Sequence, residues 1–134
     1  MATGPAVETA RVLLVDDDPS ILALLESTFG GDRRFEIYTA LTGDQALHIS
    51  RDVQPHLVLL DVMLPGRDGY SACRLIKNDE RCAGTQVVLL SALDQQAEGD
   101  TWKKVGADDF LIKPIRPSEL LSAVERRLKM TSTG

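Results

Sequence analysis

The chain has 134 residues, of which 43% are hydrophobic and 26% charged, the composition of one water-soluble globular domain. The chain has 15 Lys and Arg residues and 20 Asp and Glu residues, which gives a net charge of −5. This negative charge argues against nonspecific binding of nucleic acid by this domain. The apolar runs are far shorter than the ~20 residues of a membrane span, so no membrane contact is expected. With only two cysteines and no secretory signal, a cytoplasmic location is expected.

The first half of the chain alternates segments typical of strands and helices. In chain order these are a strand at Arg11–Asp16, a helix from Pro19 to about Phe29, a strand at Phe35–Ala40, a helix that begins at Thr42 or Gly43, and a strand at His56–Asp61. Asp18 is the expected N-cap of the first helix, because its carboxylate can accept a hydrogen bond from a free backbone N–H. Residues 1–10 are expected to be flexible.

The second half continues the same alternation. In chain order it has a Pro/Gly loop at Leu64–Gly69, a helix from Tyr70 to about Asn78, a strand at Gln86–Ser91, a helix at Asp94–Val105, a strand at Ala107–Ile112, and a helix from Pro117 or Ser118 to Leu128. Asp68 is the expected N-cap of the helix at Tyr70. The helix at Asp94–Val105 is the weakest, since it is polar and contains Gly99, at a cost of about 1 kcal/mol relative to Ala.

This order of elements predicts a parallel α/β sheet. Strands that alternate with helices of this length form right-handed crossovers, with helices on both faces of the sheet. Short continuous apolar runs are typical of strands buried on both faces. Residues 11–129 are therefore expected to form the domain, and residues 130–134 a flexible tail or the start of a linker.

Four of the predicted strands end on polar residues, which are Asp16-Asp17-Asp18, Asp61, Ser91 and Lys113-Pro114. In an open α/β sheet the ligand site lies just beyond the carboxyl ends of the strands. Neighbouring carboxylates repel one another unless a cation neutralises them, and Mg²⁺ prefers oxygen ligands. The sequence therefore predicts a Mg²⁺ site that handles phosphate, with Asp61, which stands apart from the Asp run, as the better nucleophile.

Four motifs in this order resemble the receiver domain of response regulators, the phosphoacceptor module of two-component signalling. They are VLLVDDDP, LVLLDVMLPGRDGY, VVLLSA and GADDFLIKP, and together they cover the chain from about Val12 to Leu128. The resemblance implies the flavodoxin-like fold of this family, a five-stranded parallel sheet in the order 2-1-3-4-5.

The resemblance also implies a role for each site residue. Asp61 would accept the phosphoryl group from a phosphohistidine of a histidine kinase. Mg²⁺ would be held by Asp16, Asp17, Asp61 and the backbone carbonyl of Met63. Ser91 would turn toward the phosphoryl group, Lys113 would pair with it, and a cis peptide bond would join Lys113 to Pro114. Phe110 would occupy the aromatic switch position, where it lacks the hydroxyl of the more usual tyrosine.

The partners implied are a sensor histidine kinase or phosphotransfer protein upstream, and a C-terminal effector domain or separate protein downstream. Phosphorylation would switch the surface near the fourth helix, the fifth strand and the last helix, and could drive homodimer formation. The resemblance implies that the domain is not an enzyme that turns over a separate substrate, because it would catalyse only its own phosphorylation and dephosphorylation. Met63 and Leu93 are apolar where the family's attacking water passes, which predicts slow self-dephosphorylation.

Two alternatives stay open at this point. Asp16-Asp17-Asp18-Pro19-Ser20 fits the Asp-x-Asp-x-Ser pattern of a Mg²⁺-dependent haloacid-dehalogenase-type phosphatase, with Asp16 as nucleophile. In that family, however, the lysine precedes the second acidic pair, whereas here Asp108-Asp109 precede Lys113, and Asp61 has no role. The other alternative is a pseudo-receiver that only docks partners, which the complete set of Asp and Lys residues argues against.

Overall fold

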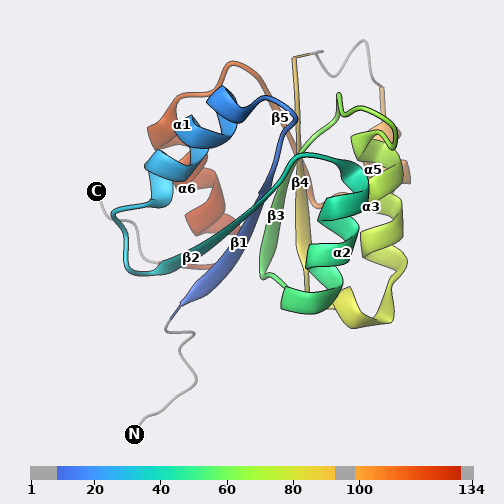
Figure 1. Ribbon diagram of the computed structural model, residues 1–134, viewed down its shortest axis with the longest axis horizontal. Coiled ribbons are helices and arrows are strands. Elements are labelled where there is room, and N and C mark those ends of the chain that lie inside the picture. Colours follow the sequence, from blue (N-terminus) through green and yellow to red (C-terminus); the bar gives the residue numbers. More distant parts are fainter. Residues whose placement is uncertain (1–8, 93–98, 131–134) are drawn as a thin grey trace, which may run out of the picture.

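The computed structural model of the protein describes residues 9–92 and 99–130. Its centre is a five-stranded sheet in the order β2-β1-β3-β4-β5, with every neighbouring pair parallel. Helices cover both faces (Figure 1), α1 and α6 on one and α2, α3 and α5 on the other. The predicted fold class and strand order are confirmed.

The elements follow the predicted alternation closely. The strands are Ala10–Val15 (β1), Phe35–Ala40 (β2), Leu57–Asp61 (β3), Gln86–Ser91 (β4) and Asp109–Ile112 (β5). The helices are Pro19–Phe29 (α1), Gly43–Val53 (α2), Gly69–Asn78 (α3), Thr101–Lys104 (α5) and Pro117–Arg127 (α6), with a short 3-10 turn at Glu80–Cys82 (η1). Asp18 and Asp68 cap α1 and α3 as predicted, because their Oδ1 atoms accept hydrogen bonds from the backbone N–H groups of Ser20 and Ser71.

The helix predicted at Asp94–Val105 differs most from the structure. Residues 93–98 lie outside the described residues, and only Thr101–Lys104 of the remainder is helical. Gly99 has a φ of +63°, the left-handed region that a right-handed helix cannot pass through. The fifth strand also begins later than predicted, at Asp109 instead of Ala107, and the carboxylate of Asp108 accepts a hydrogen bond from the backbone N–H of Val87.

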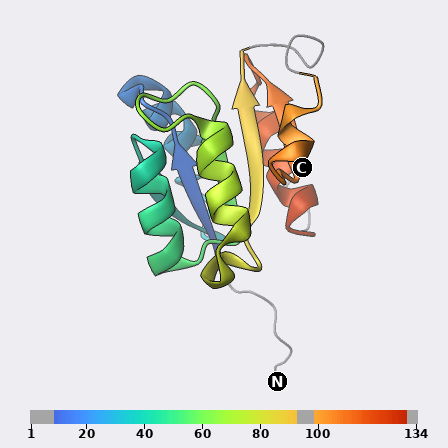
Figure 2. The same ribbon diagram turned by 90° about the vertical axis from the view of Figure 1, so that its right-hand side faces the viewer.

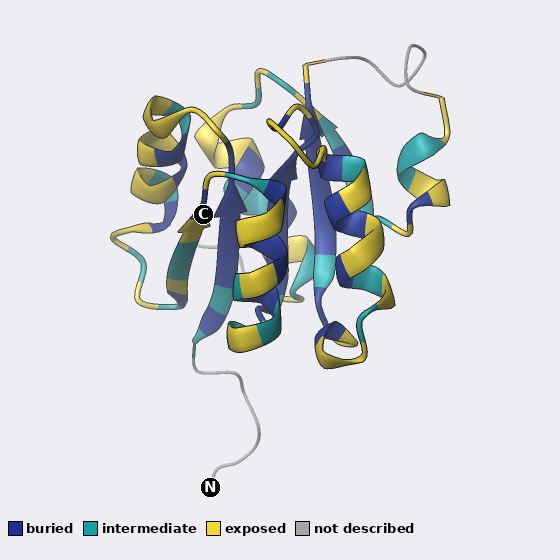
Figure 3. Cartoon of the chain, turned by 45° about the vertical axis from the view of Figure 1, so that its right-hand side comes forward, coloured by how far each residue is buried: buried dark blue, intermediate teal, exposed yellow. Residues whose placement is uncertain are grey.

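Side chains of the central strands alternate between two hydrophobic clusters, one on each face of the sheet. The cluster under α2 and α3 contains Leu13, Val15, Val58, Leu60, Val87 and Leu89. The cluster under α1 and α6 contains Val12, Leu14, Leu57, Leu59, Val88 and Leu90. All of these strand residues are buried, so β1, β3 and β4 form the dark-blue centre of Figure 3. Buried on both faces, these strands hold their carboxyl ends in fixed positions.

The ends of the domain are partly outside the described residues. Most of the segment 1–10 and all of 131–134 lie there, so their predicted flexibility stays a prediction, as do the domain limits. Ala10 is already the first residue of β1, and the backbone N–H of Met130 donates to the carbonyl of Glu125. No helix in the described part of the chain is long and apolar enough to cross a membrane.

Candidate functional site

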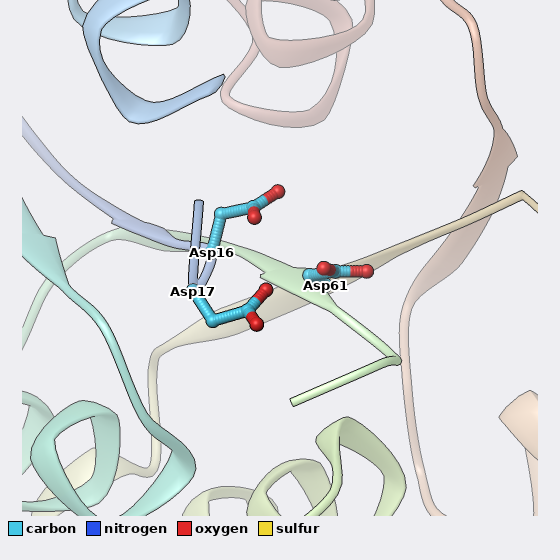
Figure 4. A group of neighbouring side chains, drawn as sticks. All are labelled: Asp16, Asp17 and Asp61. Carbon is cyan, nitrogen blue, oxygen red and sulfur yellow. The ribbon is translucent and has the colours of Figure 1, made fainter. Parts of the chain in front are cut away.

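Three carboxylates meet at the carboxyl end of the sheet. Asp16 and Asp17 directly follow β1, and Asp61 is the last residue of β3, which pairs with β1. One oxygen from each lies within 4.8 Å of the others (Figure 4). Asp16 is 2% and Asp61 6% exposed, whereas Asp17 lies in solvent. Two buried carboxylates at this spacing repel each other strongly unless a cation lies between them.

Lys113 places a positive charge on this cluster. Its Nζ lies 3.0 Å from Asp16 Oδ2 and 3.5 Å from Asp61 Oδ1. The residue follows β5 directly, and its backbone N–H donates to the carbonyl of Ser91, which fixes the chain beside the end of β4. The predicted cis peptide bond between Lys113 and Pro114 is present. Lys113 therefore pairs with Asp16 here, at the site where a phosphoryl group is expected.

Two backbone N–H groups orient the buried carboxylates. The N–H of Asp18 donates to Asp16 Oδ1 at 3.0 Å, and that of Met63 donates to Asp61 Oδ1 at 3.2 Å. Both are turns in which a side chain accepts from the backbone two residues later. The contact from Asp18 was not predicted, because the sequence indicated only its cap role. The signal that could have identified it is an Asp directly before the turn into a helix.

The environment of Asp61 raises the pKa of its carboxyl group. Burial is the main cause, the ammonium of Lys113 opposes it, and the Asp16 carboxylate adds to it. The charge on Lys113 therefore does not fully compensate the burial of Asp61. A further cation at this position would stabilise the ionised form.

The remaining predicted site residues lie on the same edge or next to it. Ser91, fully buried, ends β4 one residue after Leu90, the partner of Asp61 in the sheet. Met63 follows β3 and exposes 63% of its surface. Phe110 is buried in β5, with its ring centroid 6.4 Å from that of Trp102 in α5. Leu93 lies outside the described residues.

The donor set fits Mg²⁺. The ion takes about six oxygens and keeps several waters, so two or three carboxylates are enough. Asp16, Asp17 and Asp61 provide such oxygens, and two of these residues are buried. The carbonyl of Met63, two residues beyond Asp61, is a fourth candidate ligand.

Asp108 lies away from this edge. Its carboxylate accepts hydrogen bonds from Lys77 Nζ and from the backbone N–H of Val87, near the start of β4. Parallel strands put this position at the opposite end of the sheet from Asp61. The acidic pair that a phosphatase of the alternative type needs therefore does not join Asp16. His56 is also distant, since its Nδ1 accepts from the N–H of Arg11 early in β1.

Comparison with known proteins gives a consistent result. The family model described as "response regulator receiver domain" matches residues 12–125. Among curated proteins, the DNA-binding response regulator MtrA of Mycolicibacterium smegmatis is 39% identical over 119 residues, which are 89% of this chain and 50% of that protein. The chain thus spans about half the length of the curated relatives it matches.

Two solved structures are similar over nearly their whole length. The BeF3-activated receiver domain of DrrB has a TM-score of 0.78 and 36% identity, covering 90% of this chain and 98% of that one. The receiver domain of the sensor histidine kinase PA1611 of Pseudomonas aeruginosa has a TM-score of 0.82 and 26% identity over the same shares of the two chains. That structure has a magnesium ion in its active-site cleft.

Proposed function

The chain belongs to the response regulator receiver domains, the phosphoacceptor modules of two-component signalling, and we propose that Asp61 is its phosphoacceptor. The observation that carries this assignment is the state of the carboxylate oxygens. Both oxygens of Asp16 are engaged, Oδ1 by the N–H of Asp18 and Oδ2 by Lys113. Asp61 is buried, unlike Asp17, and its Oδ2 receives no hydrogen bond from the described residues, so, unlike the oxygens of Asp16, this oxygen is available to attack phosphorus.

The proposed reaction is a displacement at phosphorus. An oxygen of Asp61 attacks the phosphoryl group of a phosphohistidine, the P–N bond breaks, and the imidazole leaves with the electron pair of that bond. The product is an acyl phosphate on Asp61, which water later hydrolyses. Such transfers depend mainly on positioning and on neutralisation of charge. Mg²⁺ held by Asp16, Asp17, Asp61 and the carbonyl of Met63 would supply part of that neutralisation.

Two further residues are proposed to respond to the phosphoryl group. The ammonium of Lys113 lies 3.5 Å from Asp61 Oδ1, so it needs only a small movement away from Asp16 to pair with a phosphoryl oxygen. The hydroxyl of Ser91, at the end of the neighbouring strand, would donate a hydrogen bond to another. These movements would favour one of two packings around Phe110.

The proposed partners follow from this chemistry. A sensor histidine kinase or phosphotransfer protein supplies the phosphohistidine. The output is an effector domain or a separate protein that recognises the surface of α5, β5 and α6, where Trp102 contacts Phe110. A homodimer formed on phosphorylation is a further candidate for that surface. The curated relatives named DNA-binding response regulators have about twice the length of this chain, which agrees with an effector domain in those proteins.

The test is incubation with acetyl phosphate, a small acyl-phosphate donor, with and without Mg²⁺, followed by intact mass. We expect one Mg²⁺-dependent phosphoryl adduct on the wild type and none on Asp61→Asn. Asp52→Asn is the matched control, because Asp52 is exposed near the end of α2, away from the carboxyl ends of the strands. Sustained turnover of a phosphomonoester that is lost in Asp16→Asn would instead support the phosphatase.

A further inference from the structure

The segment 62–68 between β3 and α3 adjoins the oxygens of the proposed site. It begins next to Asp61 and carries the carbonyl of Met63. The N–H of Val62 donates to the carbonyl of Leu90, and the N–H of Gly69 donates back to the carbonyl of Val62, both at 2.9 Å. Figure 2 shows the segment at the end of the molecule toward which the strand arrows point. A shift of this segment would move the carbonyl of Met63 and disturb the end of β3, which carries Asp61.

Gly69 packs closely against the backbone of Asp61 and Val62. A Cβ at position 69 would lie 2.3 Å from the carbonyl oxygen of Asp61 and 2.7 Å from the Cα of Val62. Both atoms belong to the backbone, so rotation of a side chain cannot relieve the overlap. The φ of Gly69 is not in the left-handed region, so the position requires glycine for space and not for backbone freedom. Even alanine would push the end of β3 and the start of α3 apart.

Gly43 contacts the other end of the segment. It is the first residue of α2, and a Cβ there would lie 2.7 Å from the carbonyl oxygen of Arg67. The same Cβ would lie 3.3 Å from the Cβ of Ala72 in α3. Next to this contact, Asp44 Oδ1 accepts a hydrogen bond from Arg67 Nε at 2.7 Å. The first turn of α2 thus packs closely against the end of the segment at Arg67, whereas Gly69 packs against the beginning of the segment at Val62.

We propose that Gly43 and Gly69 are positioning residues for the phosphoacceptor site. Together they hold the segment 62–68 close enough to the sheet for the oxygens of Asp61 and Met63 to share one cation with Asp16 and Asp17. The inference rests on the proposed function for its effect on phosphoryl transfer. Its effect on metal binding follows from the placement of the oxygens alone.

The chain contains a matched control. A Cβ at Gly84 would meet no atom within 4 Å, and the φ of Gly84 is not in the left-handed region. Gly84 lies before β4, at the opposite end of the sheet from Asp61. Gly84→Ala therefore makes the same chemical change as Gly43→Ala and Gly69→Ala, without the overlap and far from the site.

The experiment compares these three alanine variants with the wild type by thermal unfolding, by calorimetric titration with Mg²⁺, and by the rate of phosphorylation by acetyl phosphate at saturating Mg²⁺. Since a misplacement of about 1 Å can cost about 100-fold in rate, we expect a loss of that order in Gly69→Ala and about tenfold in Gly43→Ala. The Kd for Mg²⁺ should rise in both. Gly84→Ala should match the wild type in Mg²⁺ affinity and in phosphorylation rate.

Folded Gly43→Ala and Gly69→Ala proteins with wild-type Mg²⁺ affinity and rate would overturn the inference. If Gly69→Ala does not fold, Gly43→Ala decides, and if neither unfolds cooperatively, the glycines serve the fold instead of the site and the inference is wrong. A wild type that binds Mg²⁺ but takes no phosphoryl group on Asp61 would overturn the proposed function. Weaker Mg²⁺ binding in the two variants would still support the positioning role in that case.

Discussion

At the scale of single residues, Lys113 and a cation bound at the proposed site would compete for the same carboxylates. The Lys113 ammonium lies 3.0 Å from Asp16 Oδ2 and 3.5 Å from Asp61 Oδ1. It therefore offsets part of the negative charge of the site without metal, and it would repel a metal ion that enters the site. This position would allow one lysine to serve the two proposed states, paired with Asp16 before phosphorylation and with the phosphoryl group afterwards.

We expect Lys113→Ala to bind Mg²⁺ more tightly than the wild type. Removal of one positive charge a few ångströms from a divalent ion at the protein surface changes the free energy by about 1–2 kcal/mol, so the Kd should fall about tenfold. Calorimetric titration measures it. Lys104→Ala, which removes an exposed charge in α5, is the control. An unchanged or higher Kd in Lys113→Ala would contradict the competition.

A second residue-scale prediction concerns the lifetime of the phosphoryl group. The side chain of Met63 is 63% exposed beside Asp61 and offers no hydrogen bond to an attacking water. Met63→Asn or Met63→Glu should therefore change the rate of dephosphorylation, with little cost in stability because the position is exposed. The decay of the adduct is followed by intact mass after removal of the donor. Leu75→Asn, on the surface of α3, is the control, and an unchanged decay in both Met63 variants would refute the role of Met63.

At the scale of elements, the turn from β1 into α1 divides three successive carboxylates between two tasks. Asp16 and Asp17 face the site, whereas the side chain of Asp18 caps α1. The cap could be predicted from the sequence, because Asp18 precedes Pro19 at the start of an apolar helical pattern. The hydrogen bond from the N–H of Asp18 to Asp16 could not, because it depends on the exact path of the turn.

This division predicts opposite effects of two neighbouring substitutions. Asp18→Ala should lower the free energy of unfolding by about 1 kcal/mol through loss of the cap, and leave the Mg²⁺ affinity nearly unchanged. Asp17→Ala should weaken Mg²⁺ binding and, without metal, preserve or raise stability because one repelling charge is removed. Urea denaturation and calorimetric titration of both variants provide the comparison. Equal effects of the two substitutions on Mg²⁺ binding would show that the tasks are not divided.

His56 connects the amino ends of β1 and β3, because its Nδ1 accepts a hydrogen bond from the backbone N–H of Arg11. Only an unprotonated Nδ1 can accept this bond. Burial lowers the pKa of His56, and the charge of Arg11 lowers it further, while Nδ1 accepts the N–H of Arg11. Between the lowered folded pKa and the ordinary value of 6.5, the unfolded chain binds a proton that the folded chain does not. The free energy of unfolding should therefore fall as the pH drops below 6.5.

The measurement is urea denaturation between pH 7.5 and about 5. His56→Asn keeps an acceptor near the position of Nδ1 but cannot be protonated, so it should lose this part of the pH dependence. His48→Gln, at an exposed position of α2, should keep it. If His56→Asn shows the same slope as the wild type, His56 is not its source.

At the scale of the whole molecule, the sequence was sufficient to predict the architecture because each strand is a short apolar run that ends on a polar residue. That pattern placed Asp16, Asp61, Ser91 and Lys113 at one edge before any contact was known, and the structure brings the first three strand ends and Lys113 together there. Local propensity could not predict where the fold leaves no room for a Cβ atom. Gly69 was predicted as the last residue of a loop, and only the approach of the Asp61 backbone shows why it has no side chain.

The ends of the fourth predicted helix are a second feature that the sequence could not predict. Gly99 was recognised as a weak helical position, but the sequence does not reveal that its φ is positive or that only Thr101–Lys104 is helical among the described residues of this segment. Likewise Asp108 was predicted as part of the strand Ala107–Ile112, whereas its carboxylate joins Lys77 of α3 to the start of β4. Such links between distant segments arise from the tertiary arrangement, and periodicity carries no information about them.

The central claim is that a signal is stored on Asp61, and chemical mapping of the phosphoryl group tests it most directly. Protein phosphorylated by acetyl phosphate with Mg²⁺ is reduced with borohydride, which converts an aspartyl phosphate to homoserine, and the peptides are sequenced by mass spectrometry. The account predicts homoserine at position 61 alone, and none when Mg²⁺ is removed by a chelator. Homoserine at position 16 or 17, or a wild type left unmodified, would contradict it.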